Sequence, residues 1–247
     1  MRTKVLLSIA ERGKFYEKMR GTIVCIHEKI GEEITHPIGG GVFLLVGSRK
    51  LGLTAAHVVK GEKNLSIVTY NKVLHDVKLL YIDFERDVAL LDVLGKSNEF
   101  ECTQLCETNE LTISSEIHFI GHPRRQVFAY NIGNVCCAEK TCRNIYEVWD
   151  IHHPQLKSYD LIDDFREFSP SMKLVQAKNV HDGGSGALFL DGDGNIIGLY
   201  SFSFKENITF PRWLYEDAKA KLTQLINSQN VITCTNDEVE KLKTCKN

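Results

Sequence analysis

The sequence predicts an all-β protein of two antiparallel six-stranded β-barrels, with a short helix at each end of the chain. Short segments rich in β-branched residues, separated by glycines and other turn residues, follow one another from Thr22 to Phe204. Many short strands at such spacing are typical of barrels and sandwiches. A polar stretch at 96–112 divides the segments into two sets. The chain of 247 residues, 43% of them hydrophobic, is long enough to bury a proper core.

The first 20 residues combine basic residues with a short apolar patch, so we expect an amphipathic N-terminal helix at 1–20. The patch is too short for the apolar region of a secretory signal peptide, and charged residues resume directly after it. No apolar run in the sequence approaches the length needed to cross a bilayer. These features predict a cytoplasmic or nuclear protein with no membrane partner.

The first barrel is expected at residues 21–112. Its six predicted strands are Thr22–His27, Gly41–Val46, Leu51–Thr54, Leu65–Thr69, Leu74–Ile82 and Val88–Val93. The second barrel is expected at residues 113–210. Its predicted strands are Ile117–Ile120, Gln126–Glu139, Ile145–Trp149, Leu174–Lys178, Ala187–Leu190 and Ile196–Phe204.

Two connections within the second barrel have distinct sequences. The sequence DGDGN at 191–195 is a strong hairpin-turn signal between the last two strands. The polar segment 152–171 has no strand period, and we interpret it as an inserted surface loop.

Beyond the second barrel, apolar residues recur at helical spacing in the segment 211–229. Pro211 stands at its start, and proline is well tolerated in the first turn of a helix. We therefore expect a C-terminal helix at 211–229, followed by a polar tail at 230–247.

Ser185 stands between glycines in the sequence HDGGSGALFL and precedes an apolar run. A serine hydroxyl is a strong nucleophile only when a neighbouring base takes its proton and backbone amides stabilise the resulting oxyanion. His57, in the sequence LTAAHVV, and Asp87, in RDVALL, supply a candidate base and a carboxylate to orient it. The chain order His, Asp, Ser is that of the chymotrypsin-type arrangement and differs from the subtilisin and α/β-hydrolase orders.

These sequences resemble trypsin-like serine proteases of the chymotrypsin fold, and most closely the intracellular HtrA/Deg-type protease domains. TAAHV resembles the box of the catalytic histidine, DVALL that of the aspartate, and GGSGA that of the serine, which usually reads GNSGG or GDSGG. IGHP at 120–123 resembles a Gly-x-Pro turn of the second barrel, and NIIGLYSFS at 195–203 resembles the strand that lines the substrate cleft. The resemblance runs from about residue 21 to about residue 225, and no PDZ-like segment is apparent.

The resemblance implies a serine endopeptidase with a chymotrypsin-like double barrel. In this family the serine, here Ser185, is the nucleophile, and the histidine, here His57, is general base and then general acid. Asp87 would fix the histidine tautomer and stabilise the imidazolium. The backbone amides of Gly183 and Ser185 would form the oxyanion hole.

The resemblance also assigns the substrate-binding residues. Asn179, six residues before the serine, would lie at the base of the pocket for the side chain that precedes the cut bond. Because Asn179 is neutral, we expect no preference for Lys or Arg, and a small or medium uncharged side chain instead. Ser201, Phe202 and Ser203 would line the cleft, where main-chain groups pair with an extended peptide.

Two positions depart from the family pattern. Gly184 replaces the Asp or Asn that usually precedes the serine, and Ala187 replaces a glycine. In secreted relatives, a new N-terminal amine pairs with that carboxylate and orders the oxyanion loop. Gly184 has no charge to pair, so we expect residues before Thr22 to be structural rather than a propeptide. The freedom of Gly184 leaves open an oxyanion loop that is ordered only when substrate binds.

Other functions and partners follow from the same residues. One alternative is a catalytically weak or inactive protein of this fold that binds peptides or a protein partner, and another is a small-molecule esterase. We expect protein or peptide substrates, no nucleic acid because the formal net charge is −2, and no metal or organic cofactor.

None of the eight cysteines lies near His57 or Ser185 in the sequence, which favours reduced thiols. A homotrimer is common among HtrA-like relatives, but the sequence itself indicates no trimer surface.

Overall fold

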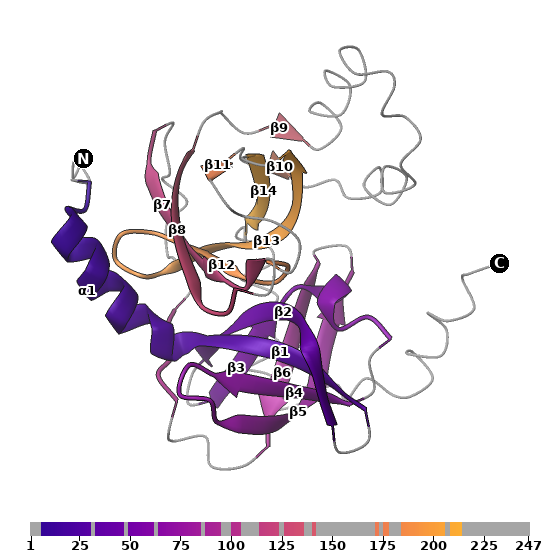
Figure 1. Cartoon of the computed structure of the whole chain (residues 1–247). Helices are drawn as coiled ribbons and strands as arrows, with labels where there is room; N and C mark the ends of the chain where they lie inside the picture. Colours follow the sequence, from indigo (N-terminus) through magenta and orange to yellow (C-terminus); the bar gives the residue numbers. More distant parts are fainter. Residues whose placement is uncertain are drawn as a thin grey trace.

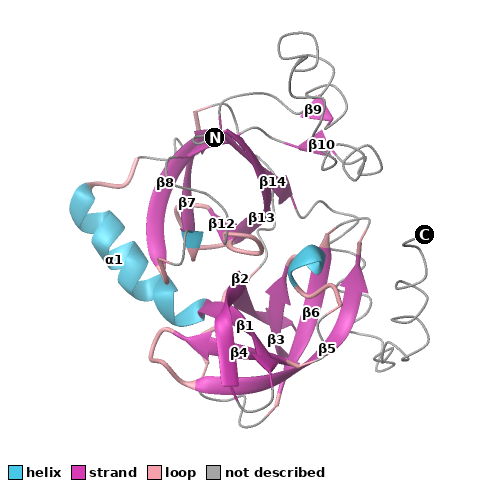
Figure 2. Ribbon diagram, turned by 45° about the vertical axis from the view of Figure 1, so that its right-hand side comes forward, coloured by secondary structure: helices cyan, strands magenta, loops and turns pink. Residues whose placement is uncertain are grey.

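The computed structural model of the chain consists mainly of β-strands (Figure 1). It describes residues 6–30, 33–46, 49–61, 64–84, 87–94, 100–104, 114–123, 126–135, 140–141, 171–172, 175–177, 184–205 and 208–213. Two sets of strands lie one above the other, and a single long helix runs along one side of both (Figures 1 and 2). The prediction of a mainly β protein with an N-terminal helix is confirmed.

The N-terminal helix, α1, covers Ile9–Met19 and continues as a 3₁₀ turn, η1, over Arg20–Thr22. It begins with a capping box, in which the Ser8 backbone N–H donates to Glu11 Oε2 at 2.7 Å and the Glu11 backbone N–H donates to Ser8 Oγ at 3.4 Å. These bonds satisfy donors at the helix start that have no intrahelical partner. Among the described residues, no helix has the length and apolar character needed to cross a membrane.

The first six strands form a closed barrel in the order β1-β2-β3-β6-β5-β4. They are β1 (Ile23–Ile30), β2 (Glu33–Val46), β3 (Arg49–Thr54), β4 (Leu65–Thr69), β5 (Leu74–Asp83) and β6 (Val88–Val93). All six predicted strands are therefore present. The structure extends β1 and β2 beyond the predicted ends, and these two strands pair from Ile23↔Val42 to Ile30↔Glu33.

The second sheet also has six strands, with the order β11-β14-β13-β12-β7-β8. They are β7 (Glu116–Gly121), β8 (Ala129–Val135), β11 (Val175–Ala177), β12 (Leu188–Leu190), β13 (Ile196–Lys205) and β14 (Ile208–Trp213). β11 also pairs with β8, from Val175↔Val135 to Ala177↔Gly133. A separate two-stranded sheet joins β9 (Lys140–Thr141) to β10 (Ser171–Met172).

Three sequence predictions need correction in this sheet. The predicted helix at 211–229 begins in a region that is strand, because β14 runs through Pro211 to Trp213 and pairs with β13. The predicted strand Gln126–Glu139 starts later, because residues 126–128 form a turn before β8. Ser171, the last residue of the predicted loop 152–171, belongs to β10 of the separate two-stranded sheet. The predicted strand Ile145–Trp149, the residues 152–170 and the segment 214–247 lie outside the described residues.

The buried hydrophobic side chains of the described residues form three clusters. One lies inside the first barrel and one within the second sheet. The third is shared: it joins Phe15 and Met19 of α1 to side chains of both sheets, including Val42 of β2 and Leu188 of β12. α1 and the two sheets are therefore packed around a common core.

The two cysteines among the described residues, Cys25 and Cys102, are both free thiols. Burial raises the pKa of Cys25 to about 12, so this thiol stays protonated at neutral pH.

Candidate active site

A histidine and an aspartate form a close pair in the first barrel. His57 lies in a 3₁₀ turn, η2 (Ala56–Val58), directly after β3, and Asp87 lies directly before β6. The Nδ1 atom of His57 is 3.0 Å from Asp87 Oδ1 and 2.9 Å from Oδ2, and the backbone N–H of His57 donates to Oδ1 at 3.0 Å. Because an ionised carboxylate only accepts, Nδ1 carries a proton, and in the neutral ring the lone pair lies on Nε2.

Exposure differs sharply between the two partners. The Asp87 side chain is 7% exposed, whereas the His57 side chain is 41% exposed. A buried carboxylate that orients a more exposed imidazole leaves the basic nitrogen accessible to a ligand. Asp87 also has a left-handed backbone, with φ of 51°. Such a conformation is unusual for a residue other than glycine and is concentrated at functional sites.

Ser185 lies on a tight turn between β11 and β12 that is held by backbone hydrogen bonds. Its carbonyl accepts from the Gly40 N–H of β2 at 2.7 Å, which ties the turn to the first barrel. Within the turn, Ala187 N–H donates to Gly184 O at 2.9 Å. Gly186 N–H donates to Tyr200 O of β13, also at 2.9 Å. The backbone on either side of Ser185 is therefore anchored in both sheets.

Glycines allow this turn to approach the histidine. A Cβ atom on Gly39 would lie 2.8 Å from the carbonyl oxygen of Ser185 and 2.6 Å from Cγ1 of Val58, the residue after His57. Gly39 thus lies between the turn that contains Ser185 and the turn that contains His57, and a side chain at this position would push the two turns apart. Gly186 has φ of 76°, and a Cβ on it would collide with Gly40 O and Thr54 Oγ1.

Sequence reasoning did not identify this glycine support. The signal available was the run Gly39-Gly40-Gly41 inside a strand, because glycine in a strand often marks a close approach of another backbone. Thr54, within the histidine box, has a similar role: its hydroxyl donates to Gly40 O at 2.7 Å.

Comparison with known proteins agrees with this geometry. The family model of the trypsin-like peptidase domain matches residues 39–199, which include Gly39, His57, Asp87 and Ser185. The chain belongs to the trypsin-like peptidase family. It is also similar to the serine protease Do-like HtrB of Bacillus subtilis (strain 168), with 23% identity over 169 residues. That match covers 68% of this chain and 33% of the relative, so the chain spans about a third of the relative's length.

The structure describes some of the remaining predicted site residues and not others. Ser201, Phe202 and Ser203 belong to β13, which pairs with β12 and β14. Asn179 and Gly183 lie outside the described residues. In the described part of the chain, no group of three or more His, Cys, Asp or Glu side chains is placed to hold a metal ion.

Proposed function

We propose that this protein is a serine endopeptidase with a chymotrypsin-like double barrel, in which Ser185, His57 and Asp87 act as a catalytic triad. The observation that carries the proposal is the Asp87–His57 pair beside the anchored turn of Ser185. Two carboxylate oxygens within 3.0 Å of Nδ1 orient the imidazole. The pairing of β11 with both β14 and β8 supports the double barrel.

The proposed reaction follows from these roles. Ser185 Oγ attacks the peptide carbonyl while its proton passes to Nε2 of His57. The resulting imidazolium then gives this proton to the leaving amine, which yields an acyl-enzyme. Water, deprotonated by His57 in the same way, releases the acid product and restores Ser185. The backbone N–H groups of Gly183 and Ser185 are the proposed donors to the oxyanion.

We propose that an extended peptide binds along β13 and adds to this sheet through main-chain hydrogen bonds at Ser201–Ser203. Asn179 is proposed for the base of the specificity pocket. A neutral residue there would not compensate the lost hydration of a lysine or arginine side chain, so uncharged side chains before the cut bond are expected. A substrate profile dominated by cleavage after Lys or Arg would contradict this part of the proposal.

The proposal is tested with a serine-directed phosphonate, followed by intact mass and peptide mapping. Wild-type protein should gain one phosphonyl group, located on Ser185. Ser185→Ala should not be labelled, and His57→Ala should be labelled very slowly. Ser115→Ala, which removes a hydroxyl from the residue directly before β7, is the matched control and should label like wild type.

The alternative is a protein of this family that binds peptides without turnover. Gly184 favours it, because the carboxylate or amide usual at that position is absent. Peptide binding by wild-type protein without labelling at Ser185 and without cleavage would support this alternative and reject the endopeptidase.

A further inference from the structure

A buried histidine outside the proposed triad connects the two sheets. His122 follows β7 directly and is 0% exposed. Its Nε2 is 3.0 Å from Val24 O of β1, and its Nδ1 accepts from the Phe128 N–H at 3.0 Å. A carbonyl only accepts and a backbone N–H only donates, so Nε2 carries the proton and the ring is neutral. We call His122, Val24 and Phe128 together the joint.

The joint lies next to the turn of Ser185 on two sides. Val24 pairs with Gly41 of β2, and the neighbouring Gly40 holds the Ser185 carbonyl. On the other side, a Cβ atom on Gly121 would lie 2.5 Å from Cβ of Ala187. The residue before His122 therefore packs directly on the serine turn. His122 thus links two parts of the protein that both contact the turn of Ser185. One is the β1–β2 pair, and the other is the end of β7 at Gly121.

Phe128 is held in an unusual conformation at the joint. Its φ is 57°, which a bulky residue adopts only when its surroundings impose it. His122 takes its N–H, and the Tyr16 hydroxyl of α1 donates to its carbonyl at 2.9 Å. Its ring meets the ring of His122 edge-on, with centroids 4.8 Å apart, and that of Tyr70 at 5.3 Å.

The 3₁₀ turn η1, directly after α1, fastens the same region to the first barrel. Arg20 NH1 donates to the Tyr70 hydroxyl at 2.7 Å, and the Arg20 guanidinium lies 4.2 Å from the centre of the Tyr70 ring. Tyr16 of α1 therefore contacts Phe128 of the second sheet. Arg20 of η1 contacts Tyr70, which directly follows β4 of the first barrel.

We propose that His122 is a positioning residue for the serine nucleophile: its bond to Val24 fixes the second sheet against the first barrel, and so fixes Ser185 relative to His57. The proposal rests on the proposed endopeptidase function. Displacement of a reacting group by about 1 Å can cost about 10²-fold in rate. Loss of the bond to Val24 should therefore lower kcat by about 10- to 100-fold and change KM little, because His122 does not touch the substrate strand β13 through any described contact.

The experiment compares three substitutions at one position. His122→Phe keeps an aromatic ring at this position and removes the hydrogen bonds to Val24 O and from the Phe128 N–H. His122→Gln keeps a long N–H donor for Val24 O, whereas His122→Asn keeps a shorter acceptor for the Phe128 N–H. The proposal expects kcat in the order wild type, Gln, then Asn and Phe. Equal loss in all three, or a better Asn than Gln, would overturn the role of the Val24 bond.

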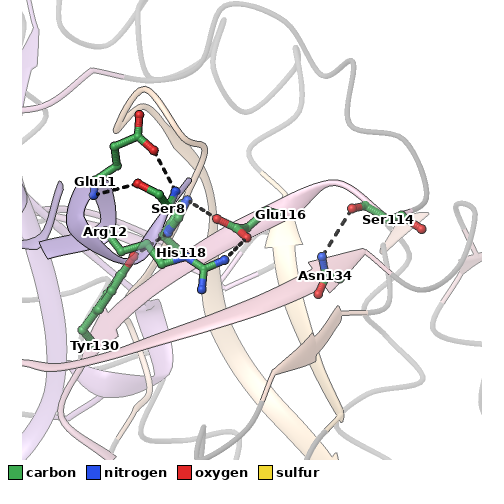
Figure 3. A network of polar contacts seen from close by, with 8 residues as sticks. All are labelled: Ser8, Glu11, Arg12, Ser114, Glu116, His118, Tyr130 and Asn134. Carbon is green, nitrogen blue, oxygen red and sulfur yellow. Dashed lines mark hydrogen bonds and ion pairs between the residues drawn. The ribbon is translucent and has the colours of Figure 1, made fainter. Parts of the chain in front are cut away.

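His118 supplies the matched control. It lies on β7, the strand that His122 follows, and is equally buried at 0% exposure, but it faces α1. Its Nδ1 is 2.7 Å from the Tyr130 hydroxyl, and its ring is tilted against that of Phe15 with centroids 4.4 Å apart. Figure 3 shows His118 beside Glu116, which meets Arg12 of α1 at 2.7 Å. His118→Phe should lower stability and leave kcat per folded molecule unchanged; a matching fall in kcat would show a general effect of the sheet and overturn the proposal.

Amide hydrogen exchange separates this inference from the proposed function. In His122→Phe, the Gly40 and Gly186 amides, which donate to Ser185 O and Tyr200 O, should exchange at least about tenfold faster than in wild type. They should keep wild-type protection in His118→Phe. Wild-type protein that is not labelled at Ser185 would reject the endopeptidase, and exchange at these amides would still decide the role of His122. Unchanged exchange in His122→Phe would overturn it.

Discussion

The first barrel and the second sheet contribute to the candidate site in different ways. The first barrel holds His57 and Asp87 through side-chain bonds within one closed set of strands. The second sheet contributes Ser185 on a turn whose own carbonyl is bound by Gly40 of the first barrel. The positions of His57 and Asp87 therefore depend on the first barrel, whereas the position of Ser185 depends on contacts between the first barrel and the second sheet.

This difference separates two kinds of damage. A change inside the Asp87–His57 pair alters protonation and ring orientation, which are chemical properties of the base. A change at the joint leaves that pair intact and alters only where Ser185 lies. Large losses of rate are expected from the first kind, and smaller losses, together with altered protection of the serine turn, from the second.

The largest loss of kcat is expected when Ser185 of the second sheet or His57 of the first barrel is replaced, because both take part in the proposed reaction. Ser185→Ala and His57→Ala should each lower kcat for a cleaved peptide by about 10⁶-fold, and the double variant should lose little more. Triad members act as a unit, so the first substitution already abolishes the contribution of the triad to catalysis, and a second substitution has little further effect. Steady-state rates of both single variants and the double variant test this; independent, multiplying losses would contradict the shared role.

The next effect lies within the first barrel alone. Asp87→Asn should lower kcat by about 10⁴-fold, because the amide can present an N–H to Nδ1 and favour the wrong histidine tautomer. Asp92→Asn, on β6, the strand that directly follows Asp87, is the control and should keep wild-type kcat. A loss in Asp87→Asn that appears only in KM would show that Asp87 does not act through His57.

The same contrast appears in what the sequence predicts. All six strands of the first barrel follow from turn residues and β-branched runs, and each predicted strand overlaps an observed one. In the second sheet, β14 is missed because Pro211 and the spacing of nearby apolar residues imitate a helix start. The pairing of β14 with β13 decides its conformation, and this tertiary contact has no local signature.

Within the site, the sequence predicts the residues proposed for catalysis but does not predict the residues that position them. His57, Asp87 and Ser185 stand in boxes with a recognisable order. The role of His122 depends on Val24, which is 98 residues away in the sequence, and on Phe128. A lone histidine after a strand gives no indication of that distant partner. Long-range contacts of this kind require the structure.

Protonation of His122 in acid should weaken the joint, because the charged ring can no longer accept from the Phe128 N–H. Burial lowers the pKa of His122 to about 4 from its ordinary 6.5, the bond to Val24 O opposes this shift, and His27 adds to it. The unfolded chain thus binds more protons between these values, so the stability contributed by His122 is complete above about pH 6.5 and is lost as the pH falls through about 4. The full shift corresponds to about 3 kcal/mol.

Urea unfolding at pH 7 and pH 4.5 measures this loss. Carboxylates also titrate in this range, so wild type is compared with His122→Gln, in which the titrating ring is absent. Wild-type protein should lose about 2 to 3 kcal/mol more than the variant between the two pH values. Equal losses would show that His122 does not stay neutral in the folded protein.

The smallest effect is expected at the far end of α1. Ser8→Ala removes the acceptor for the Glu11 backbone N–H and should lower the free energy of unfolding by about 1 kcal/mol. The phosphonate labelling rate per folded molecule should not change, because Tyr16 and Arg20, the residues of this helix and η1 that contact Phe128 and Tyr70, lie beyond the first turn. Tyr16→Phe, which removes the bond to Phe128 O, should instead slow labelling several-fold. A faster rate in either variant, or after removal of residues 1–20, would indicate an inhibitory N-terminus and contradict a supporting role for α1.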